Sequence, residues 1–187
     1  MEIKMNALKG LEIARKKILF RPDINSPIDP VTKKIVNDNR LKKNAVTLKY
    51  MLENGAAVAL IAHQGDTQDY QNLIPLMEHA QKLTALTGHP VHYIDDVCGP
   101  AAIEAVKKLP AGEAIILGNL RYLGEELSTF SNFVKLSPEE MQSVWHVRKL
   151  APLFDLYVND AFSAAHRGAP SMVAFPHVLP SAAGFQF

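Results

Sequence analysis

The sequence predicts an α/β protein, a three-layer α/β/α domain of the doubly wound, Rossmann-like type with a parallel central sheet. Short continuous apolar runs, such as Ala56–Ala62, lack the polar alternation of a half-exposed strand, which indicates strands covered on both faces. Segments of helical periodicity separate these runs about five times along the chain, as right-handed crossovers between parallel strands require.

The bulk composition is that of an ordinary globular protein. A chain of 187 residues fits one domain, because domains commonly hold about 100–200 residues, so we take 1–187 as a single unit. Hydrophobic residues make up 48% and charged residues 21%, with a net charge of +1, which excludes disordered, membrane-spanning and nucleic-acid-coating classes. Cys98 is the single cysteine and no signal-peptide-like segment begins the chain. We therefore expect a cytoplasmic monomer with no nucleic-acid or membrane partner.

The first half of the chain predicts two strands and two helices. Residues 1–17 are interpreted as a lead-in to a strand at Ile18–Phe20. Arg40–Asn54 is predicted as a helix because apolar residues recur every three or four positions, and Gly55 suits a left-handed cap. Ala56–Ala62 is the second strand, and Leu73–Gly88 is the second helix.

The middle of the chain continues this alternation. Val91–Ile94 is predicted as a strand, Ala101–Leu109 as a helix with Pro100 in its first turn, and Glu113–Leu117 as a strand. Tyr122–Leu136 has a weak pattern and is interpreted as a long excursion of undetermined role.

The last part is expected to hold one helix and two strands. Ser137, Pro138 and Glu140 combine the signals of a helix start, and this helix is expected to run to about Leu150 or Phe154. Leu156–Val158 and Ser171–Phe175 are predicted as strands. The tail VLPSAAGFQF ends without a polar cap, so we expect the natural chain to continue beyond its final phenylalanine.

Polar side chains follow most of the predicted strands. The carboxyl ends of parallel strands lie along one sheet edge, where ligands bind, so these side chains are expected to surround one cleft. Arg40 and Arg167 begin or border the helices that follow. Arginine binds phosphate or carboxylate in bidentate fashion and Asp or Asn suits hydroxyls, which predicts a small, anionic, hydroxylated ligand. The strand-end residues are Asp23, Asn25, His63, Asn119, Arg121, Asn159 and Asp160.

Each of these residues also has a plainer interpretation. Asp23 and Asn25 lie in a proline-bracketed turn that both residue types favour, and a single arginine or histidine is more often a solvated charge or a structural group. Other chemistries have less support, because GxxxxGK[ST], GxGxxG, HExxH and GxSxG motifs are absent. No nucleotide site and no metal site are therefore expected in this chain.

Seven motifs follow one another between Ile18 and Phe185. They are Arg21–Pro27 (RxDxNxP), Asp38–Arg40 (DxR), Ala62–Gly65 (SHxG-like), Asp96–Pro100 (DCxGP-like), Asn119–Arg121 (NLR), Asn159–Arg167 (NDAFxxAHR) and Leu179–Phe185 (LPSxAGF). This ordered series resembles the N-terminal, phosphoglycerate-binding domain of the phosphoglycerate kinases, as a divergent member.

The resemblance implies a set of ligand contacts and a set of partners. Arg40 would be the catalytic arginine, which neutralises the phosphoryl group during transfer, a reaction that depends mainly on positioning and charge stabilisation. The resemblance also implies six parallel strands, a hinge between two domains, and Mg-ATP or Mg-ADP bound by a C-terminal nucleotide domain absent from this chain, which alone would be inactive. The residues implied to contact 3-phosphoglycerate or 1,3-bisphosphoglycerate are Asp23, Asn25, Arg40, His63, Arg121 and Arg167.

Two positions depart from the family pattern. Asp66 stands where the family usually has a phosphate-binding arginine, and the sequence after His166 reads RGAPS in place of RAHAS. Lys42 or Lys43 is a candidate to compensate the Asp66 charge. Two alternatives to a kinase half therefore stay open: a stand-alone metabolite-binding or regulatory module without catalysis, and an interaction protein with an inactive cleft.

Overall fold

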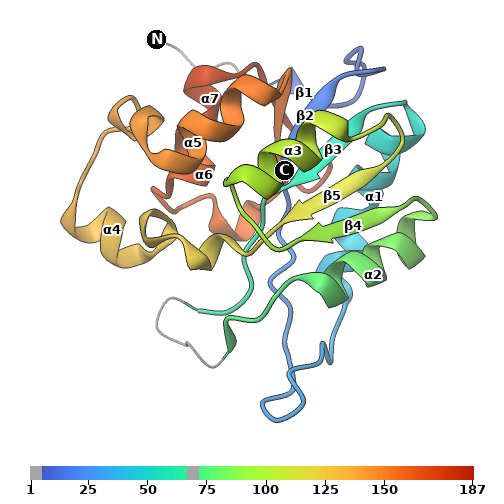
Figure 1. Ribbon diagram of the computed structural model, residues 1–187, viewed down its shortest axis with the longest axis horizontal. Coiled ribbons are helices and arrows are strands. Elements are labelled where there is room, and N and C mark those ends of the chain that lie inside the picture. Colours follow the sequence, from blue (N-terminus) through green and yellow to red (C-terminus); the bar gives the residue numbers. More distant parts are fainter. Residues whose placement is uncertain (1–5, 67–71) are drawn as a thin grey trace.

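The computed structural model describes residues 6–66 and 72–187 and contains one seven-stranded sheet. All strand pairs are parallel, in the order β1-β7-β6-β2-β3-β5-β4 (Figure 1). This confirms the predicted doubly wound α/β class, with β2 at the centre and later strands added on both sides. The strands are β1 (Asn6–Ala7), β2 (Lys17–Arg21), β3 (Ala57–Leu60), β4 (Val91–Ile94), β5 (Ala114–Leu117), β6 (Leu156–Asn159) and β7 (Ser181–Ala183).

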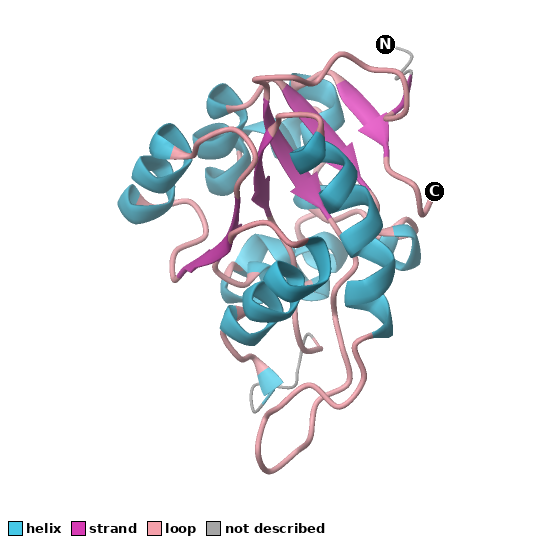
Figure 2. Cartoon of the chain, turned by 90° about the vertical axis from the view of Figure 1, so that its right-hand side faces the viewer, coloured by secondary structure: helices cyan, strands magenta, loops and turns pink. Residues whose placement is uncertain are grey.

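Helices cover both faces of the sheet, so that the strands lie between two helical layers (Figure 2). One apolar core joins the sheet to α1 (Asn39–Glu53) and α2 (Met77–Thr87). The other core joins it to α3 (Pro100–Lys108), α5 (Trp145–Leu150) and α7 (Phe175–Val178).

The alternation of side chains along β2 explains why its apolar run is continuous. Ile18 and Phe20 pack in the core beside α1, whereas Leu19 points into the core beside α3 and α5. All three are fully buried, because a strand between two helical layers has no solvent face. Gly55 ends α1 with a φ of 76°, the left-handed conformation that glycine adopts without strain.

Two predictions at the ends of the chain were wrong. Ser171–Phe175 is not a strand, because Pro170 begins the short helix α6 (Pro170–Val173) and α7 follows directly. The last strand is β7, whose residues are small and carry little strand signal. It pairs with β1, in the segment interpreted as a simple lead-in. The sheet therefore has seven strands where the resemblance implied six.

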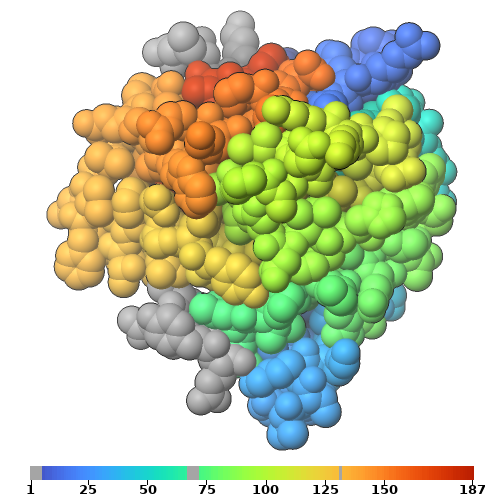
Figure 3. Space-filling view, in the orientation of Figure 1, coloured from blue at the N-terminus to red at the C-terminus, as the bar shows by residue number. Residues whose placement is uncertain are grey.

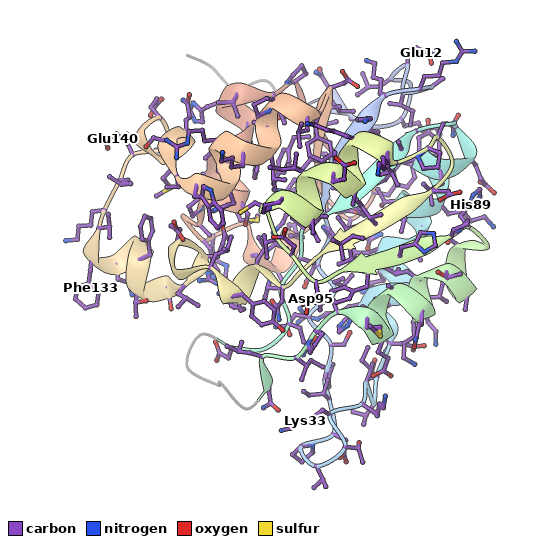
Figure 4. All side chains as sticks on the ribbon, viewed as in Figure 1. Glu12, Lys33, His89, Asp95, Phe133 and Glu140 are labelled. Carbon is purple, nitrogen blue, oxygen red and sulfur yellow. The ribbon has the colours of Figure 1, made fainter. Side chains whose placement is uncertain are left out.

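The helix predicted from Ser137 begins as expected but does not continue. Ser137 and Glu140 form the reciprocal capping box, with Ser137 N donating to Glu140 Oε2 over 2.8 Å and Glu140 N donating to Ser137 Oγ over 3.3 Å. Only the 3₁₀ turn η4 (Glu140–Ser143) follows, because Val144 is extended with a ψ of 150° before α5 starts. Glu140 lies at the molecular periphery (Figure 4).

The excursion between β5 and β6 is built from short helical turns. These are η2 (Leu120–Tyr122), η3 (Gly124–Glu126) and α4 (Ser128–Phe133), while η5 (Ala151–Leu153) leads into β6 and η6 (Phe162–Ala164) follows it. β4 and β5 end on the side of the sheet where α4 lies (Figure 1). A second projection, the loop bridged by Ile28 and Ile35, forms a separate lobe (Figure 3).

Within the described residues, none of the helices has both the length and the apolar character needed to cross a bilayer. The same part of the chain contains no group of three His, Cys, Asp or Glu side chains arranged to hold a metal ion.

Candidate functional site

The carboxyl edge of the sheet brings the predicted strand-end residues into one neighbourhood. β2 lies between β3 and β6, and β3 pairs with β5 on its other side. Asp23 and Asn25 therefore follow the central strand, His63 follows β3, and Arg121 follows β5. Arg167 comes after η6, on the β6 side.

Asp23 and Arg40 form the ion pair at the exposed rim of the site. Arg40 Nη1 lies 2.7 Å from Asp23 Oδ1, and Ser163 Oγ donates to Asp23 Oδ2 over 2.5 Å. The Arg40 side chain remains 45% exposed, so its other donors are accessible. A cavity of about 250 Å³ adjoins the pair and is lined also by Lys43 and Phe162.

Asn25 ties the loop after β2 to the loop after β3. Its Oδ1 accepts from Gly65 N over 3.1 Å, and the amide of Gln64 exchanges two 2.9 Å bonds with the backbone of Ser26. Gly65 has a φ of 91°, and a Cβ there would lie 2.7 Å from the carbonyl oxygen of Asn72. Only glycine fits this turn without strain, which fixes the position of His63 just before it.

Asn119 is a structural residue, although its position at a strand end marked it as a cleft residue. Its Oδ1 accepts from the backbone N of Gln64 and of Arg121 over 3.2 and 3.0 Å. Its Nδ2 donates to the carbonyl oxygens of Gln64 and Ile74 over 3.0 Å each. The side chain is fully buried, so its contribution is to join the β3 and β5 ends and to orient Arg121.

His63 lies at the centre of a cationic group. Its Nδ1 is 3.0 Å from Arg21 Nη2. Burial, and after it the charges of four guanidinium groups, hold the pKa of His63 well below its ordinary value. Imidazole beside four cations stays neutral because a further charge would be repelled. The four groups belong to Arg21, Arg121, Arg167 and Arg40.

Arg121 and Arg167 supply further positive charge at the site, with Arg121 buried and Arg167 half-buried. Arg121 is 6% exposed, and burial together with Arg167 and Arg21 lowers its pKa to about 10, so it stays charged at neutral pH. Its Nη1 donates to the carbonyl oxygen of Glu126 over 2.9 Å. Nη2 of Arg167 is buried and has no hydrogen-bond partner among the described residues. A buried, unpartnered donor of this kind is costly unless an acceptor arrives.

Asp160 anchors the C-terminal segment. It is 1% exposed and accepts hydrogen bonds from Thr47 Oγ1 and, over 2.7 Å, from Gln186 N. Asn159 is also buried, and its Oδ1 accepts from Ala161 N over 2.9 Å. A Cβ at Gly184 would collide with the Asp160 carboxylate. These two strand-end residues hold the backbone after β6 in place.

Asp66 acts electrostatically on Arg121. Its charge raises the pKa of Arg121, opposing the effects of burial and of the other guanidiniums. Lys42 is paired with Asp38 at 2.8 Å, and Lys43 lines the cavity beside Arg40. The departure at this position therefore weakens the positive field at a residue that faces the site.

The sequence did not mark Ser163, Glu126 or Ser171 as residues that build the site, and it marked Arg21 only as the start of the Arg21–Pro27 motif. Ser163 binds Asp23, and Arg21, Glu126 and Ser171 form a buried hydrogen-bonded line below His63. A charged residue directly after a buried strand was a usable signal for Arg21. Glu126 lies in the segment of weakest pattern and Ser171 in a segment read as a strand, so neither gave one.

The chain is similar in sequence to known proteins. A family model described as "Phosphoglycerate kinase" matches residues 8–187. The phosphoglycerate kinase of Sulfolobus acidocaldarius is 42% identical over 183 residues, and that of Methanothermobacter thermautotrophicus is 39% identical over 184 residues. Each alignment covers 98% of this chain but only 42% and 43% of the relative.

A solved structure agrees with the sequence relatives. The crystal structure of phosphoglycerate kinase from Pyrococcus horikoshii OT3 superimposes with a TM-score of 0.87 at 37% identity, covering 97% of this chain and 43% of that one. The chain thus spans less than half the length of the relatives it matches.

Proposed function

This chain belongs to the phosphoglycerate kinase family, and from that premise we propose that its cleft is the acceptor-substrate side of such a kinase. It would bind 3-phosphoglycerate or 1,3-bisphosphoglycerate while a phosphoryl group moves reversibly between that ligand and ADP or ATP, in glycolysis or gluconeogenesis. The observation that carries this proposal is the convergence of four guanidinium groups on the neutral His63. A trianionic ligand with one hydroxyl matches this charge and the polar groups beside it.

The roles divide between the two sides of the cleft. Asp23 and Asn25 would recognise the hydroxyl side, because their oxygens accept hydrogen bonds from ligand O–H as well as from Ser163 and Gly65. Arg121 and Arg167 would hold the phosphate of the acceptor, with His63 between them and the carboxylate side.

Arg40 is the residue we propose as catalytic. Of the four arginines around His63, Arg40 is the most exposed. Its ion pair with Asp23 fixes its orientation. A charged fork held at the rim can stabilise the oxygens of a phosphoryl group in flight without itself exchanging a proton.

The nucleotide is assigned outside this chain. Its sequence has no glycine-rich phosphate loop, and the chain spans less than half the length of the kinases it matches. The proposal therefore places Mg-ATP or Mg-ADP on a second, nucleotide-binding part of the kinase, and it takes 1–187 as one phosphoglycerate-binding domain that acts in the cytoplasm as a monomer. We propose that this chain alone does not catalyse the transfer.

Calorimetry with the chain itself tests the binding half of this proposal. We expect 3-phosphoglycerate to bind with favourable enthalpy, glycerate to bind at least tenfold more weakly, and glycerol not to bind, because phosphate contacts through arginine contribute about 1.5–3 kcal/mol each. Arg167→Ala should weaken binding while the exposed arginine change Arg148→Ala should not. Equal affinity for 3-phosphoglycerate and glycerol would contradict the proposal.

A chimera distinguishes the kinase half from a second candidate, a binding module without catalysis. The negative charge of Asp66, which acts on Arg121, favours this second candidate. This chain would replace the matched 43% of the Pyrococcus horikoshii kinase. Formation of ATP from ADP and 1,3-bisphosphoglycerate would support the kinase half, and its loss in Arg40→Ala would support the proposed role of that residue. A folded chimera that binds 3-phosphoglycerate but makes no ATP would support the module.

A further inference from the structure

A line of buried side chains runs beneath the cationic centre. Glu126, which is 3% exposed, accepts from Ser171 Oγ over 2.6 Å and from Ser171 N over 2.7 Å. Arg21 Nε donates to the same Ser171 Oγ over 3.2 Å. Arg21 Nη2 is 3.0 Å from His63 Nδ1. Residues of η3, α6, β2 and the β3 end are thus joined in one hydrogen-bonded path that ends at the cleft.

The direction of each hydrogen bond in this path follows from chemistry. A guanidinium group has only donors, so Ser171 Oγ accepts from Arg21 and gives its own proton to Glu126. His63 Nδ1 must likewise accept from Arg21. Its proton is therefore on Nε2, and a doubly protonated ring would set an N–H against the guanidinium N–H.

Glu126 is the group that makes a buried Arg21 tenable. Arg21 is 3% exposed, and an arginine charge in that position needs a partner of opposite sign. Burial raises the pKa of Glu126, but His146, Ser171 and Arg21 together hold it below its ordinary value, so it is a carboxylate. Arg21 Nη1 donates to the carbonyl oxygen of Pro22 over 2.8 Å, which completes the fixation of the guanidinium plane.

We propose that Glu126 and Ser171 are positioning residues, which act through Arg21 to hold His63 as a neutral ring with its proton on Nε2. Resting on the proposed function, this makes His63 a hydrogen-bond donor to an anionic oxygen of the phosphoglycerate. The opposite tautomer would present a lone pair to that oxygen and repel it. Among the described residues no hydrogen bond involves His63 Nε2, so the donor is available.

The charged groups that face His63 keep the ring neutral from several elements. Arg21 lies on β2, Arg121 on η2, Arg167 after η6 and Arg40 on α1. Glu126 does not contact the ring and reaches it only through Ser171 and Arg21. All four guanidinium groups oppose protonation of the ring, whereas the tautomer is set by Arg21 through its contact with Nδ1.

Nitrogen NMR of the chain labelled with ¹⁵N-histidine tests this proposal without any ligand. We expect a His63 signal with an unprotonated Nδ1 and a protonated Nε2, unchanged between pH 5 and 8. A protonated Nδ1, or titration of His63 near pH 6.5, would overturn the proposal. Because this measurement is made on the unmodified chain, it does not depend on the folding of a variant.

Ser171→Ala tests the positioning step, with Ser181→Ala as the matched control, since Ser181 is also buried and, in the part of the chain that the structure describes, its hydroxyl donates to the carbonyl oxygen of Leu179 alone. Ser171→Ala should give a mixture of His63 tautomers and should weaken 3-phosphoglycerate binding by about tenfold, the equivalent of one hydrogen bond. Ser181→Ala should change neither. A single unchanged tautomer in Ser171→Ala would overturn the positioning role. If the unmodified chain fails to bind 3-phosphoglycerate, the proposed function falls, while the ligand-free tautomer still decides this inference.

Discussion

The ends of β5 and β6 look alike in sequence but differ in what they do. Each strand runs into a buried asparagine whose Oδ1 accepts from the backbone N–H two residues later, and a 3₁₀ turn follows each. After β5 the residue held in this way is Arg121, which faces the cationic centre. After β6 the residue next to the asparagine is Asp160, which is buried against Thr47 and the C-terminal segment.

The difference shows that one local turn serves two purposes. Asn119 makes four hydrogen bonds to the backbone of neighbouring loops, so the β5 end is held firmly and can position the side chain of Arg121. Asn159 makes one backbone hydrogen bond, within its own turn, and its Nδ2 donates to Met172 Sδ over 4.0 Å; the β6 end is held mainly by contacts of Asp160. A polar residue at a strand end therefore predicts a ligand site only when the backbone does not use all of its hydrogen-bonding groups, as it does at Asn119.

Removing the two asparagine side chains should give the largest contrast. Asn119→Ala leaves two N–H and two C=O groups without their partners, so we expect it to lower the free energy of unfolding by about 3–5 kcal/mol. Asn159→Ala removes one backbone bond and should cost about 1–2 kcal/mol. Urea unfolding followed by circular dichroism measures both, and equal losses would refute the distinction between the two strand ends.

Removing the functional group at each strand end should separate binding from stability. Arg121→Ala should weaken 3-phosphoglycerate binding by about 100-fold, or about 2.7 kcal/mol, because a desolvated charge contact is lost. Asp160→Asn should change the dissociation constant by less than about threefold: Asp160 borders the cavity beside Arg40, but both of its carboxylate oxygens already accept from Thr47 and Gln186. Calorimetry decides between them, and comparable weakening in both variants would argue against our assignment of Asp160.

Neutralising Asp66 should sharpen the role of the β5 end. Its charge acts on Arg121 and its side chain is exposed, so Asp66→Asn should tighten 3-phosphoglycerate binding by only about two- to fivefold. The gain should shrink as salt is raised, because exposed charges are screened. Unchanged or weaker binding at low salt would count against an electrostatic effect of Asp66.

The smallest expected effect is on the pH dependence of stability, and it comes from Asp160 at the β6 end. Burial raises the pKa of Asp160 above its ordinary value of 3.8, against the hydrogen bonds from Thr47 and Gln186. A carboxyl whose folded pKa is raised contributes stability below the unfolded value and loses it as the pH rises through the folded value. Asp160→Asn stays neutral and can still pair with the Thr47 hydroxyl, so its stability relative to the unmodified chain should rise from pH 3 to pH 7, by less than about 1 kcal/mol. Chemical unfolding across this range would show a flat difference if Asp160 has no such role.

Much of the fold was predictable because one physical constraint dominates it. Strands between two helical layers must be apolar on both faces, and β2, β3 and β5 carry that signal plainly. β7 does not, because its three residues, Ser-Ala-Ala, are small and carry little strand preference. Ser171–Phe175 misled for the opposite reason, since a short apolar run fits a helix or a strand equally and Pro170 decides for the helix.

The site was predictable only as a list of residues at one sheet edge. Asp23, Arg40, His63, Arg121 and Arg167 do gather there, because the topology aligns the strand ends. The sequence could not show that Asn119 is used up by backbone contacts, or that Arg21 is buried on Ser171 and Glu126. Those facts depend on packing between segments distant in the chain, which local patterns do not record.

The pairing of β1 with β7 also constrains the order in which the chain can fold. Asn6 and Ala7 find their strand partners at Ala182 and Ala183, so β1 cannot join the sheet until nearly all of the described chain has been synthesised. During translation β2 and β3 can pair soon after they are synthesised, whereas Asn6 and Ala7 still have no strand partner. Because contacts between distant residues form late and slowly, β1 is expected to be the last strand to join the sheet, and a ribosome-bound chain that stops before β7 should leave it accessible to a protease.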